Sequence, residues 1–192
     1  MKNRKAPVEM TADRLGQLLA PRKGSQRLVL AVGVPGSGKS TIGDGIEKAG
    51  FVRLSYDAVR QRLFGDAEEH GGGGEVGKAF REELRARLAE GASVLIDNTN
   101  FLKDMRTDII DIARECGVRD VHLVVMNVPL PECLRRNRAR DRVVPTRTVR
   151  MMHWKLSNSE RPNGSEGRMT FVRPGRNRET YLVGGFAAAY CN

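Results

Sequence analysis

The amino-acid sequence predicts an α/β protein with a central, mostly parallel β-sheet and helices on both faces. Short apolar segments alternate with amphipathic segments between residues 27 and 158, as expected for strands and helices that alternate in a parallel sheet. Gly50, Gly91 and Gly117 each end a helix-like segment, where glycine suits a C-terminal cap. A glycine-rich turn directly follows the first apolar segment. Together these features indicate a doubly wound sheet.

The length and composition suit one domain with a sizeable core. The chain has 192 residues, and no segment approaches the apolar length of a membrane span. The first five residues lack the apolar stretch of a signal peptide, and three widely spaced cysteines favour a reducing compartment. We therefore expect a single cytoplasmic domain over residues 1–192, without membrane association, in which residues 1–26 form an N-terminal extension.

The strands are predicted from short apolar segments that have turn residues on both sides. In chain order they span residues 27–32, 51–55, 93–97, 121–128 and 180–183. Most of them are rich in Val, Leu and Ile, as strands buried on both faces are. Apart from its last strand, the chain beyond residue 161 is rich in Gly, Pro and Asn, and we expect it to be loop-like.

The helices are predicted from apolar residues that recur every three or four positions. They span residues 11–20, 39–49, 57–64, 75–90, 105–116 and 146–158. The clearest is 75–90, where Val76, Phe80, Leu84 and Leu88 would form one buried stripe. Four consecutive glycines at 71–74 indicate a surface loop over residues 65–74.

The turn between the strand predicted at 27–32 and the helix predicted at 39–49 fits the P-loop pattern G-x-x-x-x-G-K-[ST]. In such a loop the backbone N–H groups surround phosphate oxygens at the positive end of a helix. Lys39 would reach the β- and γ-phosphates, and the hydroxyl of Ser40 would hold Mg²⁺. The sequence therefore predicts a nucleoside triphosphate site formed by Gly33, Pro35, Gly36, Ser37, Gly38, Lys39, Ser40 and Thr41.

Asp57 and Arg60 follow the second strand and lie three residues apart at the start of a helix, so they share one face. A carboxylate there can accept a proton from an attacking hydroxyl, and the arginine can bind a phosphate of the same substrate. The spacing equally suits an aspartate that caps the helix and forms a local ion pair. The residues alone leave both interpretations open.

Asp97 ends the third apolar strand, beside the predicted P-loop. A carboxylate at this place in a P-loop protein orients Mg²⁺, either directly or through water. The alternative is an ordinary turn residue at the end of a strand, and the P-loop favours the metal interpretation.

The positive charge of the chain is concentrated in one segment. The formal net charge is +10, and residues 135–150 contain Asp141 as their single acid among seven arginines: Arg135, Arg136, Arg138, Arg140, Arg142, Arg147 and Arg150. Arginine binds phosphate oxygens in a bidentate manner. A solvated helical face is the alternative, but such faces usually mix both signs of charge. We expect residues 129–145 to form an arginine-rich lid over the phosphates.

Taken together, these motifs resemble those of the 5′-hydroxyl polynucleotide kinase family, of the phage and bacterial RNA-repair types. The matching pieces are G-x-P-G-S-G-K-S-T at 33–41, D-x-x-R at 57–60, D-x-T-N at 97–100, and R-N-x-x-R followed by V-P at 136–145. They occur in the family's order over residues 28–157. The resemblance implies a P-loop kinase fold and transfer of the γ-phosphate of ATP, with Mg²⁺, to the 5′-hydroxyl end of DNA or RNA.

The resemblance also implies roles for single residues on the donor side. Lys39 and Ser40 would serve ATP and Mg²⁺. Arg140 would be the lid arginine on the ATP phosphates, with Arg136 in support.

On the acceptor side, the resemblance makes Asp57 the general base that activates the 5′-hydroxyl, and Arg60 the ligand of the 3′-phosphate of the terminal nucleotide. Thr99 and Val144 would line the pocket for that nucleoside. Either Arg138 or Arg142 would contact the strand.

Two other functions fit part of the same pattern. A small-molecule P-loop kinase, acting on a sugar, a nucleotide sugar or an antibiotic hydroxyl, shares the P-loop, the acidic base and the arginine lid. A nucleotide-switched binding protein would need the P-loop but no base, so Asp57 and the arginine segment speak against it.

Overall fold

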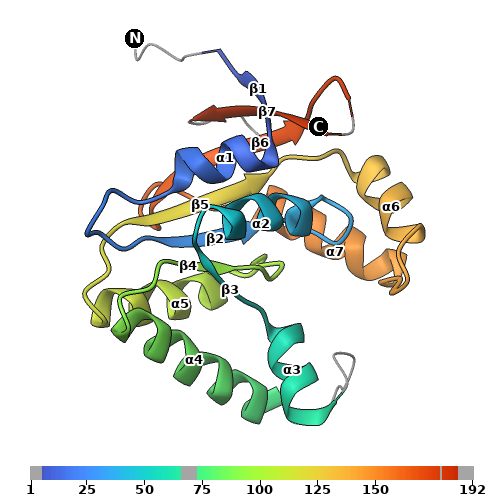
Figure 1. Cartoon of the computed structure of the whole chain (residues 1–192). Coiled ribbons are helices and arrows are strands. Elements are labelled where there is room, and N and C mark those ends of the chain that lie inside the picture. Colours follow the sequence, from blue (N-terminus) through green and yellow to red (C-terminus); the bar gives the residue numbers. More distant parts are fainter. Residues whose placement is uncertain (1–5, 66–72, 178, 186–192) are drawn as a thin grey trace.

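The computed structural model describes residues 6–65, 73–177 and 179–185, and in this part of the chain seven strands form one sheet. The strands are β1 (Val8–Thr11), β2 (Leu28–Val32), β3 (Val52–Leu54), β4 (Val94–Ile96), β5 (Val121–Met126), β6 (Arg168–Pro174) and β7 (Thr180–Gly185). Their order across the sheet is β1-β7-β6-β5-β2-β4-β3 (Figure 1). The strands from β6 to β3 are parallel, whereas β7 is antiparallel to both of its neighbours. The predicted mostly parallel α/β sheet is confirmed.

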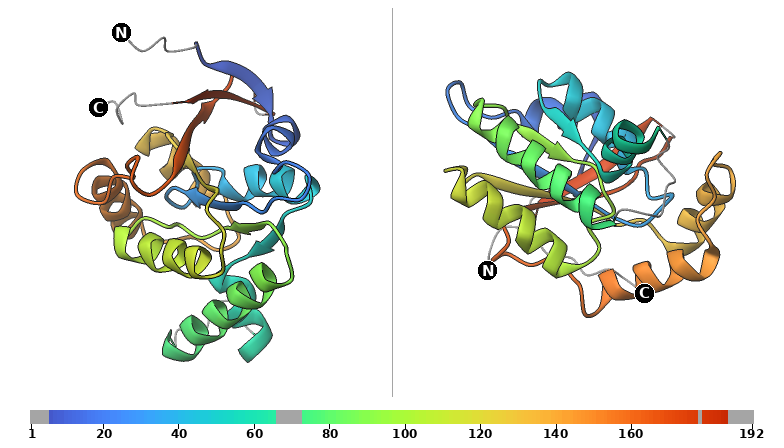
Figure 2. Two further views of the ribbon diagram at one scale, coloured as in Figure 1. Left: turned by 90° about the vertical axis from the view of Figure 1, so that its left-hand side faces the viewer. Right: turned by 90° about the horizontal axis from the view of Figure 1, so that it is seen from below.

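Helices cover both faces of the sheet. They are α1 (Ala12–Leu19), α2 (Lys39–Lys48), α3 (Tyr56–Phe64), α4 (Gly73–Ala89), α5 (Lys103–Glu115), α6 (Leu130–Arg138) and α7 (Thr146–Ser157). Figure 2 shows α1 and α2 on one side of the sheet and α5 and α7 on the other. Within the described residues, no helix is both long enough and apolar enough to cross a bilayer.

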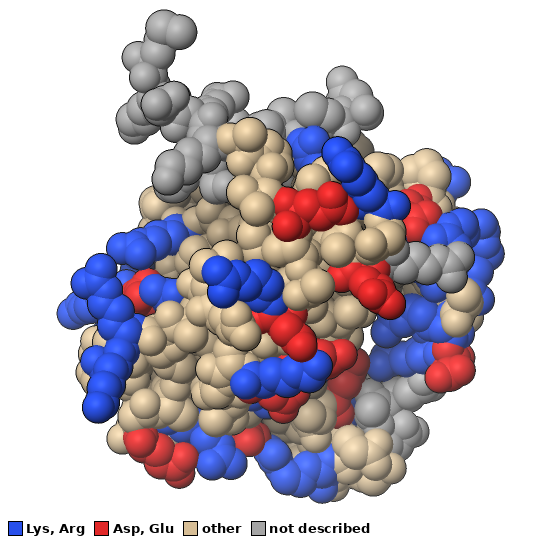
Figure 3. Space-filling model, turned by 45° about the horizontal axis from the view of Figure 1, so that its top comes forward, with Lys and Arg blue, Asp and Glu red and all other residues tan. Residues whose placement is uncertain are grey.

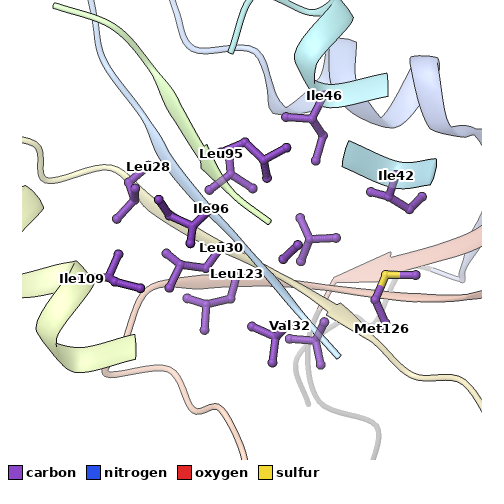
Figure 4. Packing of buried hydrophobic residues seen from close by; sticks show 14 of the residues in the cluster. Leu28, Leu30, Val32, Ile42, Ile46, Leu95, Ile96, Ile109, Leu123 and Met126 are labelled. Carbon is purple, nitrogen blue, oxygen red and sulfur yellow. The ribbon is translucent and has the colours of Figure 1, made fainter. Parts of the chain in front are cut away.

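The core lies between these layers and is centred on β2. All five residues of β2 are fully buried, because β4 and β5 flank this strand and helices cover both of its faces. Leu30 and Val32 lie with Ile96 and Leu123 of the neighbouring strands on one face of the sheet, and Ile42 of α2 lies on the opposite side of β2 (Figure 4). This packing fixes the end of β2, from which the P-loop leaves the sheet.

The two ends of the chain contain the main departures from prediction. Residues 168–174 were expected to be loop-like, but they form β6, which pairs with β5 and β7. Residues 8–11 form the edge strand β1, which was not predicted. β1 has only four residues, and its partner β7 lies near the other end of the chain. The parallel partner of β6 is β5, and α6 and α7 lie between these two strands in the sequence. The predicted strand at 180–183 is confirmed as β7, whereas most of the predicted 65–74 loop lies outside the described residues.

The N-terminal extension packs closely on the helix that follows the P-loop. The predicted helix at 11–20 is confirmed as α1, with Thr11 as its N-cap. A Cβ added at Gly16 would lie 2.0 Å from the Gly45 carbonyl oxygen, and one added at Gly45 would lie 2.3 Å from the Ala12 carbonyl group. The backbones of α1 and α2 therefore touch, and only glycine fits at either position.

Candidate active site

The P-loop leaves β2 and enters α2, as the sequence predicts. Gly36 and Gly38 have φ angles of 79° and 91°, which favour glycine. A Cβ at Gly36 would lie 2.2 Å from the Cys133 carbonyl oxygen, so α6 packs directly against the loop. Ser37 Oγ is buried without a hydrogen-bond partner among the described residues. An unsatisfied hydroxyl beside the free amides of a helix N-terminus fits a bound phosphate.

Lys39 lies in the first turn of α2, where its Nζ donates a hydrogen bond to the Val34 carbonyl oxygen at 3.0 Å. Burial of the ammonium group, together with nearby Arg140, lowers the pKa of Lys39 to about 8, although Asp97 opposes the shift. A phosphate group placed here would favour the charged form of this lysine.

A cavity of about 670 Å³ opens beside the P-loop. One wall is the P-loop and the start of α2, the second is α6 with Arg136 and, just after the helix, Arg140, and the third is the β6–β7 turn. Its volume is in the range of small-ligand sites. The predicted phosphate-binding arginines thus line the same cavity as Lys39, Ser40 and Thr41.

A glutamate of α6 partly neutralises the positive charge of the arginine-rich cavity wall. Glu132 accepts hydrogen bonds from Arg135 at 2.6 Å and from Arg136 Nε at 2.6 Å. The Arg135 guanidinium, and then that of Arg136, hold the pKa of Glu132 down at about 2. In Figure 3, Lys and Arg gather at the right-hand edge, on the side where Figure 1 places α6, with acidic side chains among them.

Asp57 lies at the start of α3, and its Oδ1 is 2.7 Å from Arg60 Nη1. The same oxygen is 3.5 Å from Nη1 of Arg142, in the segment between α6 and α7. Ser55 caps the helix by accepting a hydrogen bond from Ala58 N at 3.1 Å, so Asp57 is not the cap. The ion pair of the alternative interpretation is present, but the carboxylate remains 60% exposed and accessible to a substrate.

Asp97 is nearly buried and pairs with Arg53 of β3, which contacts it through Nε at 3.0 Å and through Nη2. Both contacts go to Oδ2 of the carboxylate. Arg53 also pairs with Asp44 of α2 at 2.6 Å and lies 3.5 Å from the Ser40 carbonyl oxygen. A carboxylate and a hydroxyl are the hard oxygen ligands that Mg²⁺ prefers, so Asp97 and Ser40 fit this ion, with phosphate oxygens and water completing its shell.

The loop after β4 links three parts of the site. The Thr99 carbonyl oxygen accepts a hydrogen bond from Gly33 N at 3.0 Å, which ties the loop to the P-loop. Asn98 Oδ1 accepts one from Tyr56 N at 2.9 Å and so holds the first residue of α3. Asn100, which is buried with a φ of 46°, donates through Nδ2 to the Ala31 carbonyl oxygen at 2.7 Å.

A fully buried arginine supports this loop from behind. Arg106 of α5 donates to the Asn100 carbonyl oxygen at 3.0 Å and to the Glu160 carbonyl oxygen at 3.0 Å. It also forms an ion pair with Glu166, whose side chain is 4% exposed. The loop is thus held by a charged pair inside the protein.

Val144 lies at the end of the segment that follows α6. Its carbonyl oxygen accepts a hydrogen bond from Asn137 Nδ2 at 2.8 Å, and its amide donates to Asn137 Oδ1 at 3.2 Å. These two bonds close the loop that carries Arg140 and Arg142. The segment predicted to form the lid, residues 129–145, therefore consists of α6 and a loop that these two hydrogen bonds attach to that helix.

The structure arranges the predicted residues in two groups. Arg136, Arg140 and the P-loop line the cavity, and Asp57 and Arg60 form a cluster with Arg142. Asp97 and Thr99 lie in the loop that joins the groups. Sequence reasoning missed Arg53, Asn98 and Arg106. Only Asn98 carried a sequence signal, because it lies inside the D-x-T-N motif. Arg53 and Arg106 carried none, because charged residues usually lie on the surface.

Comparison with known proteins places the chain in a family. Residues 28–158, more than half of the chain, match the AAA domain family AAA_33. The L-seryl-tRNA(Sec) kinase of Methanococcus maripaludis is 26% identical over an alignment 144 residues long, which covers 67% of this chain and 52% of that protein. Transcription factor bHLH140 of Arabidopsis thaliana is 28% identical over 86% of this chain and 17% of its own length. The chain thus spans about half or less of these relatives.

Solved structures share the fold. A chain of the Pnkp1/Rnl/Hen1 RNA repair complex superposes with a TM-score of 0.61 at 22% identity, over 71% of this chain and 46% of that one. A gluconokinase from Sinorhizobium meliloti superposes with a TM-score of 0.53 at 20% identity, over 82% and 87%. From the family match and the observed sheet, we conclude that the chain belongs to the AAA domain family and has the α/β fold of a P-loop kinase.

Proposed function

We propose that this chain is an ATP-dependent kinase that transfers the γ-phosphate to the 5′-hydroxyl end of DNA or RNA. The observation that carries the proposal is the cluster of Asp57, Arg60 and Arg142, in which an exposed carboxylate lies between two guanidinium groups. A carboxylate in this setting can accept a proton while the arginines hold an anionic acceptor. The donor cavity is built separately, from the P-loop and α6.

In the proposed reaction, the 5′-oxygen of the acceptor attacks the γ-phosphorus of ATP in line with the bond to the leaving oxygen. Asp57 takes the proton of the hydroxyl, the new O–P bond forms, and the bond to ADP breaks. Lys39 and Arg140 stabilise the charge that develops on the transferred group. Mg²⁺, held by Ser40 and Asp97, would neutralise charge on the β- and γ-phosphates when it is bound.

Arg60 gives the acceptor side its preference in this proposal. Its pairing with Asp57 places the guanidinium next to the base, where it would bind the 3′-phosphate of the terminal nucleotide. The M. maripaludis relative supports an acceptor that is part of a nucleic acid, because its name describes a kinase for L-seryl-tRNA(Sec). We propose cytoplasmic nucleic acid repair as the setting, and one domain over the whole chain.

The decisive experiment compares acceptors. Transfer of label from γ-labelled ATP is measured with 5′-hydroxyl DNA and RNA oligonucleotides, with the same oligonucleotides already 5′-phosphorylated, and with a panel of sugars, nucleotide sugars and antibiotics. We expect label on the 5′-hydroxyl oligonucleotides alone. Label on a small molecule and none on oligonucleotides would replace the proposal by a small-molecule kinase. Binding of nucleic acid without any labelled product would indicate a nucleotide-switched binding protein.

A further inference from the structure

The cavity beside the P-loop has an outer wall that lies beyond the matched family segment of residues 28–158. This wall is the β6–β7 turn, which contributes Pro174, Gly175, Arg176, Asn177, Thr180 and Tyr181 to the cavity lining. When the phosphates of ATP occupy the P-loop, the nucleoside must extend from them into the remaining space of the cavity. The turn is therefore available to contact the nucleoside rather than the phosphates.

The shape of this turn is set partly by its own hydrogen bonds. Gly175 N donates to the Thr180 carbonyl oxygen at 2.9 Å, and Asn177 Oδ1 accepts from Thr180 N at 2.9 Å. A Cβ added at Gly175 would lie 2.4 Å from Thr180 Oγ1, so the two arms of the turn are in close contact. These bonds close the turn but do not attach it to the rest of the protein.

The base of the turn pairs with the edge strand β1, where Thr180 lies opposite Thr11, and Glu9 of the same strand reaches the turn itself. Glu9 Oε1 accepts a hydrogen bond from Arg176 N at 2.7 Å and another from Thr180 Oγ1 at 2.6 Å. Its Oε2 lies 3.7 Å from Arg176 Nε. The Thr180 hydroxyl and then the Arg176 amide hold the pKa of Glu9 below its usual value, which keeps the carboxylate charged. One side chain thus fixes both arms of the turn.

We propose that Glu9 is a positioning residue for nucleoside recognition, which holds the β6–β7 turn and Arg176 as the outer wall of the nucleotide site. The inference rests on ATP as the phosphate donor of the proposed function, but not on the acceptor. The side chain of Arg176 is 91% exposed, so a planar base can reach its guanidinium while Nε stays near Glu9. An arginine stacked in this way binds the base through packing and charge.

The experiment separates the nucleoside from the phosphates. Binding of ATP and of inorganic tripolyphosphate, both with Mg²⁺, is measured by calorimetry on the wild-type protein and on Glu9→Ala, Thr180→Val and Arg176→Ala. We expect each variant to bind ATP about three- to tenfold more weakly, which corresponds to one or two lost contacts, and to bind tripolyphosphate as the wild type does. Glu115→Ala, which removes an exposed glutamate of α5 and its ion pair with Arg85 of α4, should change neither affinity.

Arg176→Ala keeps the test valid if Glu9→Ala fails to fold, because the side chain it removes is almost fully exposed and its loss should leave the fold intact. Equal weakening of ATP and tripolyphosphate in Glu9→Ala would show that Glu9 supports the P-loop generally, and it would overturn the proposal. Unchanged ATP binding in both Glu9→Ala and Arg176→Ala would also overturn it. The assay contains no acceptor, so a failure of the polynucleotide assignment leaves its outcome unaffected.

Discussion

Arg142 Nη1 lies 3.5 Å from Asp57 Oδ1, so the loop after α6 contacts the first turn of α3. The same loop carries Arg140 of the donor cavity, and the loop after β4 also contacts the start of α3, through the hydrogen bond between Asn98 and Tyr56. The exposed carboxylate is thus surrounded by elements that also build the donor site. Its protonation and its neighbours can be tested directly.

Replacing Asp57 should separate binding from transfer. We expect Asp57→Ala to lower kcat by about 10² to 10⁴, the usual contribution of a general base, while the affinity for ATP changes less than about twofold. Initial rates with a 5′-hydroxyl oligonucleotide and calorimetry with ATP measure the two effects. Asp111→Ala is the matched control, because Asp111 is 54% exposed and also pairs with an arginine three residues later. Wild-type rates in Asp57→Ala would eliminate the assigned base.

Removing Arg60 should alter acceptor preference. Arg60→Ala should raise KM about tenfold or more for an acceptor with a 3′-phosphate on its terminal nucleotide, because a charge-assisted hydrogen bond is lost. A 5′-hydroxyl nucleoside without that phosphate should be phosphorylated equally by variant and wild type. The ratio of kcat/KM for the two acceptors is the measurement, and Arg114→Ala on α5 is the control. An unchanged ratio would exclude phosphate binding by Arg60.

The affinity for ATP should fall as the pH rises above about 8. Burial and Arg140 lower the pKa of Lys39 to about 8 in the free protein. Bound phosphates favour the ammonium form, so above this pH binding requires uptake of a proton and the Kd should rise up to tenfold per pH unit. Below pH 7 the lysine is already charged, so its contribution to the Kd should no longer change with pH. Calorimetry in buffers of different ionisation enthalpy counts the proton, and Lys39→Met should abolish the dependence.

The buried pair of Arg106 and Glu166 should matter for stability and for the loop after β4. Arg106→Met leaves Glu166 buried without its partner, and we expect a loss of about 3–5 kcal/mol in the free energy of unfolding. Urea unfolding measures this change. The double variant with Glu166→Leu should regain part of the loss, because no lone charge then remains inside. A loss below about 1 kcal/mol in the single variant would show that Glu166 finds another partner.

Much of the fold was readable from local sequence patterns. The P-loop could be predicted because its glycines, lysine and serine stand at fixed spacing, and β2 because five apolar residues precede them. In contrast, β6 owes its existence to pairing with β5 and β7, because polar and apolar residues alternate only over its first four positions and the strand ends in Arg and Pro. Tertiary context decides such strands.

The candidate site divides in the same way. Asp57 and Arg60 were identified because three residues on a helix bring them onto one face. Arg106 was not, because its partner Glu166 is 60 residues away and a charged residue is normally read as exposed. Arg53 was missed for the same reason, since its three acidic neighbours come from α2 and from the end of β4.

The backbone contact between Gly16 and Gly45 has a practical consequence for protein engineering. A fragment trimmed to the family boundaries at residues 28 and 158 would lack α1, β1, β6 and β7. It would expose to water the glycine-lined face of α2 and the open side of β5, which invites intermolecular strand pairing. We therefore expect such a fragment to aggregate, whereas a fusion partner attached before residue 6 would leave these contacts in place.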